Sequence, residues 1–279
     1  MAPRELYSVR TGKNKNQVGL DLPRTLQLFE GLFDELKQDG YLDEYLGSWC
    51  VDQGDVPGKI RKPDLDVQIK TRKDNLWPIK DNIASYTEDD LFDITEYIHT
   101  VVSKPIEGNY HNYSNCGMHW HTFNKHEGEN YYRERVNEIL SIYVGSFEIN
   151  VNGEILAGAG RGFEPLFKAD IPTDDGNIRQ RADAAILRYR RHGSTLDDRR
   201  QAVRDLADVL EYVRPDVKKH FSAKDESELF NIINNFGIRH HNERQKTGYD
   251  AGLWLSWMFY FFLSTIHLVL RKIEDDKRS

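Results

Sequence analysis

The stretch AGLWLSWMFYFFLSTIHLVL, residues 251–270, limits most strongly what this chain can fold into. It carries no charged residue over twenty positions, which is the length that a membrane-spanning helix needs. A helix that is apolar all round can instead lie at the centre of a helical bundle or in a dimer contact. Ser256, Ser264, Thr265 and His267 dilute the apolar character. We therefore expect a helix buried in a bundle or a dimer, without stable membrane insertion.

The remainder of the C-terminal part is helical in pattern, and no strand pattern follows Pro172. Apolar residues recur at helical spacing between Leu196 and Val213, with charged residues on the other sides of the helix. Four helices are predicted, over about residues 177–191, 196–213, 226–244 and 250–272. These helices favour a compact all-α bundle over residues 173–279.

The N-terminal part, residues 1–172, mixes helix and strand patterns. A helix is predicted from Pro23 to Gly40, a second after the capping-box sequence that begins at Thr87 and ends before Pro105, and a third over residues 129–144. The alternation in residues 64–70 predicts a short strand after a loop over residues 52–63. The pair Asn152-Gly153 between two alternating runs predicts a hairpin. The expected fold class is thus an α+β N-terminal domain followed by an all-α bundle, mainly α overall.

Composition and charge narrow the class of protein. Hydrophobic residues make up 39% of the chain, which is enough to build cores. The cysteines, Cys50 and Cys116, give no disulfide framework, and the N-terminal sequence has no apolar secretion segment, so we expect a cytoplasmic protein. The net charge is −7, yet Lys and Arg outnumber Asp and Glu over residues 176–279. A phosphate-contacting surface is therefore expected in the C-terminal part.

The segment His111 to His126 gathers four histidines and Cys116, all of them residue types that bind zinc. His119 and His121 would share one face of a strand. No acidic general base accompanies them at a recognisable spacing, and the interleaved aromatic residues suit a packed strand or loop equally well. The prediction is accordingly that this segment holds no essential metal and that the protein needs no cofactor.

A polar helix face precedes the apolar stretch. On a helix, Asn231, Asn235, Arg239 and Asn242 form one continuous face, with apolar residues on the other. Asparagine is a poor helix former, so such a row points to hydrogen bonding rather than to helix propensity. Amides and a guanidinium can bind a phosphate, or they can join this helix to a neighbouring one within the bundle.

The sequence FNIINNFGIRHHNERQK, followed by the apolar helix, resembles the C-terminal helices of HEPN-superfamily proteins, especially bacterial proteins of the abortive-infection type. The resemblance extends over about residues 177–273 in helix order, and its specific part is residues 230–245. It implies a dimeric, metal-independent ribonuclease whose arginine is Arg239. In that superfamily a histidine follows the arginine after four to six residues; here the fifth position is Arg244, and the histidines are His240 and His241.

Such an enzyme needs one group to take the proton of the ribose 2′-hydroxyl, another to protonate the leaving oxygen, and a cation to stabilise charge on the phosphate. Histidine suits the proton transfers and arginine the charge. The predicted catalytic residues are Arg239, His240, His241 and Asn242, and the predicted substrate-binding residues are Asn235, Arg244 and Arg204. The expected partners are RNA, with tRNA as one candidate, and a second copy of the chain.

Two other readings stay open. A non-catalytic sensor module could use the same polar face to hold RNA, a nucleotide or a partner helix, and the absence of a histidine at the family spacing favours it. A membrane-associated effector acting through residues 251–270 is the third. The expected biological role, antiviral defence or toxin-like growth arrest, follows from the resemblance.

Overall fold

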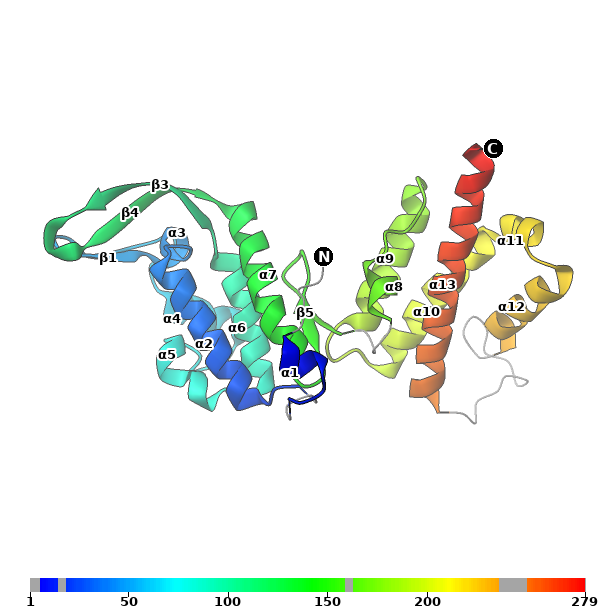
Figure 1. Cartoon of the computed structure of the whole chain (residues 1–279), viewed down its shortest axis with the longest axis horizontal. Coiled ribbons are helices and arrows are strands. Elements are labelled where there is room, and N and C mark those ends of the chain that lie inside the picture. The colour runs from blue at the N-terminus through cyan, green and yellow to red at the C-terminus, as the bar shows by residue number, and fades with distance from the viewer. Residues whose placement is uncertain (1–5, 15–18, 159–162, 236–249, 279) are drawn as a thin grey trace. The chain divides into compact units, whose positions relative to one another are not determined.

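The structure is a computed structural model, and it describes residues 6–14, 19–158, 163–235 and 250–278. By the contacts among its residues, the chain divides into two compact units, Met1–Gly158 and Ala159–Ser279. The first unit combines helices with small antiparallel strand pairs, and the second is helical where it is described (Figure 1). The predicted fold class, mainly α with a mixed N-terminal part, is confirmed.

The first unit is built from the following elements. Its helices are α1 (Tyr7–Arg10), α2 (Leu22–Gln38), α3 (Asp43–Leu46), α4 (Pro63–Thr71), α5 (Ile79–Asn82), α6 (Glu88–Val101) and α7 (Lys125–Ile142), with 3-10 turns η1 (Ile83–Ser85) and η2 (Tyr113–Asn115). Its strands pair antiparallel: β1 (Ser48–Cys50) with β2 (Gly54–Val56), β3 (Lys104–His111) with β4 (Gly117–Asn124), and β5 (Phe147–Ile149) with β6 (Ile155–Ala157).

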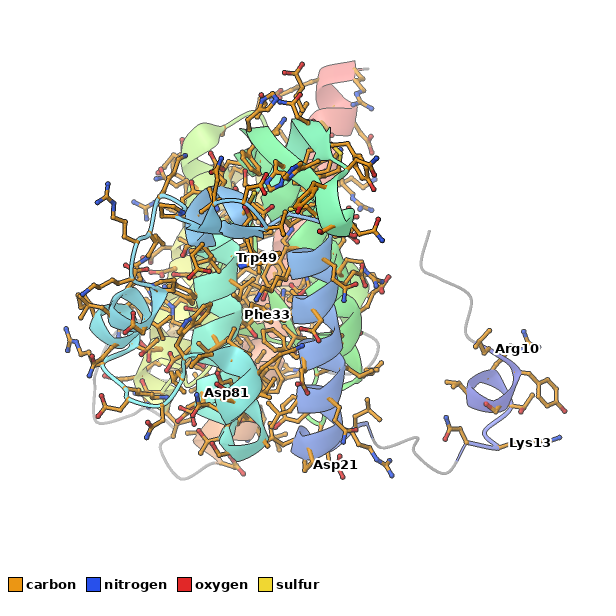
Figure 2. All side chains as sticks on the ribbon, turned by 90° about the vertical axis from the view of Figure 1, so that its left-hand side faces the viewer. Arg10, Lys13, Asp21, Phe33, Trp49 and Asp81 are labelled. Atoms are coloured by element: carbon orange, nitrogen blue, oxygen red, sulfur yellow. The ribbon has the colours of Figure 1, made fainter. Side chains whose placement is uncertain are left out.

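Helices α2, α6 and α7 supply most of the core of this unit. The Asp21 side chain caps α2 by accepting from the Arg24 N–H at 3.2 Å, and Figure 2 shows Asp21 at one end of this helix and Phe33 further along it. Residues of α2 at every third or fourth position are buried, as on one face of an amphipathic helix. On α7, the fully buried Tyr132 donates to the Thr95 carbonyl of α6 at 3.0 Å.

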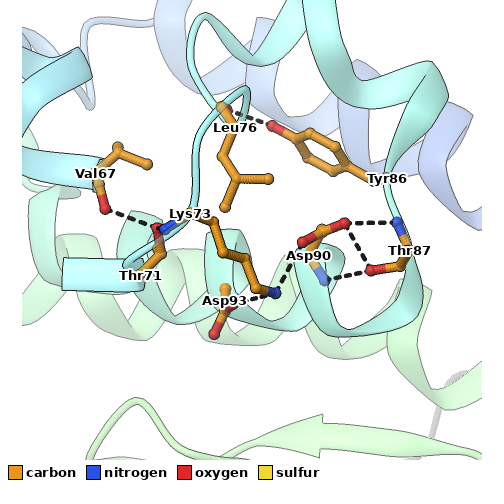
Figure 3. A network of polar contacts seen from close by, with 8 residues as sticks. All are labelled: Val67, Thr71, Lys73, Leu76, Tyr86, Thr87, Asp90 and Asp93. Carbon is orange, nitrogen blue, oxygen red and sulfur yellow. Dashed lines mark hydrogen bonds and ion pairs between the residues drawn. The ribbon is translucent and has the colours of Figure 1, made fainter. Parts of the chain in front are cut away.

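Polar contacts fix both ends of α6. At its start, Thr87 and Asp90 form the predicted capping box, and Lys73 pairs with Asp90 at 2.8 Å and Asp93 at 2.7 Å (Figure 3). Lys73 thereby joins the turn after α4 to α6. At the other end of α6, the Lys125 ammonium donates to three backbone carbonyls, those of His99 at 3.1 Å, Thr100 at 2.9 Å and Val102 at 2.9 Å. A cation at this end also interacts favourably with the helix dipole.

Strands β3 and β4 form a long two-stranded ribbon. Its base is fixed by the Ser103 N–H, which donates to the Tyr41 carbonyl at 2.8 Å, and by the Lys104–Glu127 ion pair at 2.6 Å. Part-way along, Trp120 lies so close to Gly40 that a Cβ there would come within 2.4 Å of its ring. The pairing register is irregular between Pro105 and Gly108, and the tip turns back through η2.

Two predictions for the first unit are wrong. Residues 64–70 belong to helix α4 rather than to a strand, because Pro63 and two acidic residues in its first turn favour a helix start and only Val67 of its residues is buried. The alternating Leu65 and Ile69 are exposed. Strand β2 lies inside the predicted loop over residues 52–63. The predicted Asn152-Gly153 hairpin is confirmed as β5–β6.

The second unit contains α8 (Glu164–Lys168), α9 (Gly176–Arg190), α10 (Leu196–Tyr212), α11 (Arg214–His220), α12 (Ala223–Asn235) and α13 (Ala251–Arg278). Helices α9, α10, α12 and α13 match the four predicted ones, and residues 236–244 of the predicted third helix lie outside the described residues. Helix α11 was not predicted. The domain boundary expected after residue 172 would place α8 in the N-terminal domain. In the structure α8 belongs to the second unit, where its Phe167 stacks on Phe259 of α13.

Helix α13 buries one side and exposes another. Phe259, Phe262, Leu263 and other residues on one side of it are fully buried in the core of the second unit. In the described part of the chain it is the one helix long and apolar enough to cross a membrane, and half of its most apolar window is buried. A core helix of a globular protein passes the same test, so this is weak evidence for a membrane span.

Candidate functional sites

The start of α13 is joined to α9 and α10 by aromatic and polar contacts. The Tyr189 ring of α9 stacks on Phe259 at 3.9 Å between centroids, and its hydroxyl donates to the Ser256 hydroxyl at 2.8 Å. The Arg199 guanidinium of α10 lies over the Tyr189 ring at 5.7 Å, and its Nε donates to Ser194 at 3.3 Å. Burial raises the pKa of Tyr189, which therefore stays neutral at physiological pH.

Arg199 is a cation with unusual surroundings for this bundle. Neighbouring arginines of the same helices are in ion pairs, Arg188 with Asp205 and Arg200 with Asp197 at 2.7 Å. Among the described residues, no carboxylate pairs with Arg199. Its side chain is half-buried.

The structure describes one predicted site side chain, Arg204. It lies half-buried on α10, where it donates to the Gln201 carboxamide at 3.4 Å, and Gln201 in turn donates to Asp205 at 2.9 Å. Asn235 is the last residue of α12, and its side chain is outside the description. Five predicted residues, Arg239, His240, His241, Asn242 and Arg244, lie outside the described residues.

Helix α12, which leads into that segment, has the two faces that the sequence predicts. Leu229, Phe230 and Ile233 are buried, whereas Asn231 is exposed. The Arg214 guanidinium of α11 lies over the Phe230 ring at 4.1 Å and donates to Glu226 of α12 at 2.7 Å. The helix before the polar segment is thus firmly attached to the bundle.

A second candidate site, which the sequence did not predict as a whole, lies in the first unit. The side chains of Cys50, His111, Cys116 and His119 bring one ligand atom each within 4.8 Å of one another. His111 ends β3 and Cys116 precedes β4, so the turn at the ribbon tip brings them together; His119 follows two residues into β4. The fourth member, Cys50, comes from β1 (Figure 1).

The cluster contains soft and borderline metal ligands and no disulfide, since both cysteines are free. The segment His111 to His126 was expected to hold no essential metal because it has no paired acidic base and its interleaved aromatic residues suit a packed strand or loop. The structure adds a ligand from a distant part of the chain, and His121 and His126 point elsewhere, to Thr122 and Asn130. Cys50, His111, Cys116 and His119 together therefore have the geometry of a candidate metal site.

Beside the cluster is a shallow hollow lined by Tyr41, Asp43, Cys116 and Trp120, among others. Burial raises the pKa of Asp43 to about 6, and the nearby Lys37 ammonium opposes this only in part. This carboxyl group thus titrates close to neutrality. No sequence pattern marks Asp43, because its burial depends on the packing of α3 against the ribbon.

Comparison of the chain with protein-family models, with curated proteins and with solved structures gives no match. The resemblance to HEPN proteins therefore rests on the sequence of residues 230–245 alone.

Proposed function

We propose that this protein is a cytoplasmic, metal-independent endoribonuclease that acts in antiviral defence or toxin-like growth arrest. The observation that carries the proposal is the sequence Arg239-His240-His241-Asn242 between α12 and α13. It supplies, within four residues, the guanidinium and imidazole groups that 2′-hydroxyl attack on a phosphate requires.

In this mechanism Arg239 stabilises charge on the phosphoryl oxygens. His241 or His240 takes the proton of the 2′-hydroxyl, a second proton donor protonates the leaving 5′-oxygen, and Asn242 positions the phosphate. The products are a 2′,3′-cyclic phosphate and a 5′-hydroxyl end, so atoms and protons balance without a metal ion. Asn235, Arg244 and Arg204 are assigned to RNA binding.

The described part of the bundle supports this assignment through charge. Arg199 has no carboxylate partner among the described residues and lies beside Tyr189, which is bonded to the second turn of α13. A guanidinium in such a position can take up a phosphate of the RNA backbone. The segment that bears Arg239 joins α13 immediately before Ala251.

The proposal includes a homodimer formed by α13. Leu253, Trp257, Phe261 and Leu268 fall within one narrow stripe of this helix, and Leu253 is 69% exposed and Trp257 41% exposed. The Trp257 and Phe261 rings stack with centroids 5.5 Å apart and an interplanar angle of 3°, so they form one apolar pair within this stripe. A second copy of the same stripe is a self-complementary partner for it, as a two-fold dimer requires.

The test incubates the full-length protein with total RNA and with tRNA and maps the chemistry of the cut ends. Cyclic-phosphate ends are the expected product. The metal independence of the reaction is judged from those ends and from activity in magnesium-free buffer, because a chelator would also act on the Cys50 cluster. Arg239→Lys keeps the charge but loses bidentate geometry, so we expect a loss of about 10²-fold in activity with an unchanged melting temperature.

The matched control is Arg24→Lys, an exposed arginine in the first unit, which should leave activity unchanged. If Arg239→Lys lowers the melting temperature by many degrees while cleavage per folded molecule persists, the catalytic assignment is wrong. RNA binding that depends on Arg239 without any cleavage would favour the non-catalytic sensor module, which the presence of Arg244 at the family's histidine position already supports.

A further inference from the structure

We propose that Cys50, His111, Cys116 and His119 bind one Zn²⁺ ion, which fastens the tip of the β3–β4 ribbon to β1. This inference is independent of the ribonuclease proposal. The four ligand atoms lie within 4.8 Å of one another. With Zn–S bonds of about 2.3 Å and Zn–N bonds of about 2.0 Å, a tetrahedral site has edges of roughly 3.3–3.8 Å.

Two edges of that tetrahedron are already close to these lengths. Cys116 Sγ lies 3.2 Å from His119 Nε2, and Cys50 Sγ lies 3.8 Å from His111 Nδ1. The other four edges are at most 4.8 Å long, so the ligand atoms need to approach one another by about 1–1.5 Å to complete the tetrahedron. Such a shift is within reach of side-chain rotation alone.

The ligand types select the metal. Two thiolates and two imidazoles in a tetrahedral arrangement suit Zn²⁺, whereas Mg²⁺ and Ca²⁺ take oxygen ligands. All four positions are filled by the protein, which is the pattern of a structural zinc site rather than of a catalytic one. The ion would then stabilise the fold and activate no water.

The groups around the ligands orient them for a metal. His111 Nε2 lies 3.3 Å from Asp52 Oδ2, so the carboxylate can hold the proton on Nε2 and leave Nδ1 free to face Cys50. The Val51 N–H donates to Cys116 Sγ at 3.4 Å, so a backbone amide holds this sulfur beside Cys50. Carboxylate–histidine–metal arrangements and amide–thiolate bonds of this kind support a bound ion.

The ribbon also needs such a fastening. An isolated two-stranded hairpin is at best marginally stable in water. No described residue of β3 or β4 belongs to the hydrophobic core of the first unit, and at the tip Tyr110 is 63% and Tyr113 65% exposed. Apolar burial therefore does not hold the tip in place, whereas four metal bonds would.

The experiment measures zinc in the full-length protein purified under reducing conditions. We expect about one Zn²⁺ per chain by elemental analysis, and Co²⁺ added to the stripped protein should give the intense visible bands of tetrahedral cobalt together with thiolate charge-transfer absorption. His119→Gln and Cys50→Ser should lose the metal. His121→Gln, two residues farther along the same strand, is the matched control and should keep it.

Asp52→Asn keeps all four ligands and tests the site even where a ligand variant does not fold. We expect it to weaken zinc affinity by about 10- to 100-fold in a competition with a chromophoric chelator. The proposal is overturned by wild-type protein that takes up neither zinc nor cobalt, by zinc binding that His119→Gln leaves unchanged, or by a Cys50–Cys116 disulfide that persists in reductant.

Discussion

Replacement of Lys125 by methionine should destabilise the first unit by about 2–3 kcal/mol. The Lys125 ammonium donates to the carbonyls of His99, Thr100 and Val102 at the end of α6. Methionine preserves the apolar stem and a similar volume, but it leaves these carbonyls without their donor. The change therefore isolates the hydrogen bonds and the charge from the packing of the side chain.

The magnitude follows from the geometry. Hydrogen bonds to a charged group contribute about 1.5–3 kcal/mol each, and a cation at a helix C-terminus contributes about 0.3–1 kcal/mol. The three bonds share one ammonium and are not additive. Burial lowers the pKa of Lys125, so the cost of removing the ammonium from water has to be subtracted from the contribution of the hydrogen bonds. The net effect should thus be close to that of one or two charged hydrogen bonds.

The assay is equilibrium unfolding in urea, followed by hydrogen exchange of the α6 amides. With a denaturant slope of about 2 kcal/mol per molar, the transition of the first unit should shift down by about 1–1.5 M. Lys80→Met is the matched control, because Lys80 pairs with Asp34 at 2.9 Å on an exposed surface and such pairs contribute little. A Lys125→Met shift no larger than that of Lys80→Met would refute the reasoning.

Three further outcomes are expected. The pKa of Asp43 is raised by burial to about 6, so the contribution of its neutral form to stability is present below about pH 4 and is lost as the pH rises through 6. Because the carboxyl group is partly exposed and screened by solvent, Asp43→Asn should gain about 1–2 kcal/mol over wild type between pH 4 and 7.5 in urea titrations. A difference in unfolding free energy between Asp43→Asn and wild type that stays constant from pH 4 to 7.5 would contradict this. Phe259→Ala should cost about 3–5 kcal/mol in the unfolding of the second unit, because the ring is fully buried against Tyr189; a cost below about 1 kcal/mol would show that the site collapses. Trp257→Glu should convert a dimer to a monomer in light scattering, whereas Tyr212→Glu, also exposed, should not; a wild-type monomer at micromolar concentration would exclude the dimer.

Local sequence rules predicted the elements whose cause is local. The capping box at Thr87 and the Asn152-Gly153 hairpin depend on residues a few positions apart, and both were predicted. The strand predicted over residues 64–70 was wrong because the alternating apolar side chains there include exposed ones on a helix. Pro63, in the first turn of that helix, was the signal that indicated a helix start.

The candidate metal site could be predicted only in part, because its cause is long-range. His111, Cys116 and His119 stand out in the sequence, but Cys50 is 61 residues away from His111. The pairing of β3 with β4 brings the first three together, and β1 adds the fourth. No local sequence pattern around Cys50 indicates that it is a metal ligand.

The β3–β4 ribbon is held at its base by Ser103 and Lys104 and meets β1 at its tip through Cys116. Mechanically, a beam clamped at one end swings at the other, whereas a beam held at both ends can only bow between its supports. Flexing should then concentrate where the strand register is irregular, around Glu107 and Gly108. With its tip attached, the ribbon would transmit a displacement of β1 to the ends of α6 and α7. With its tip released, the ribbon would move independently of β1.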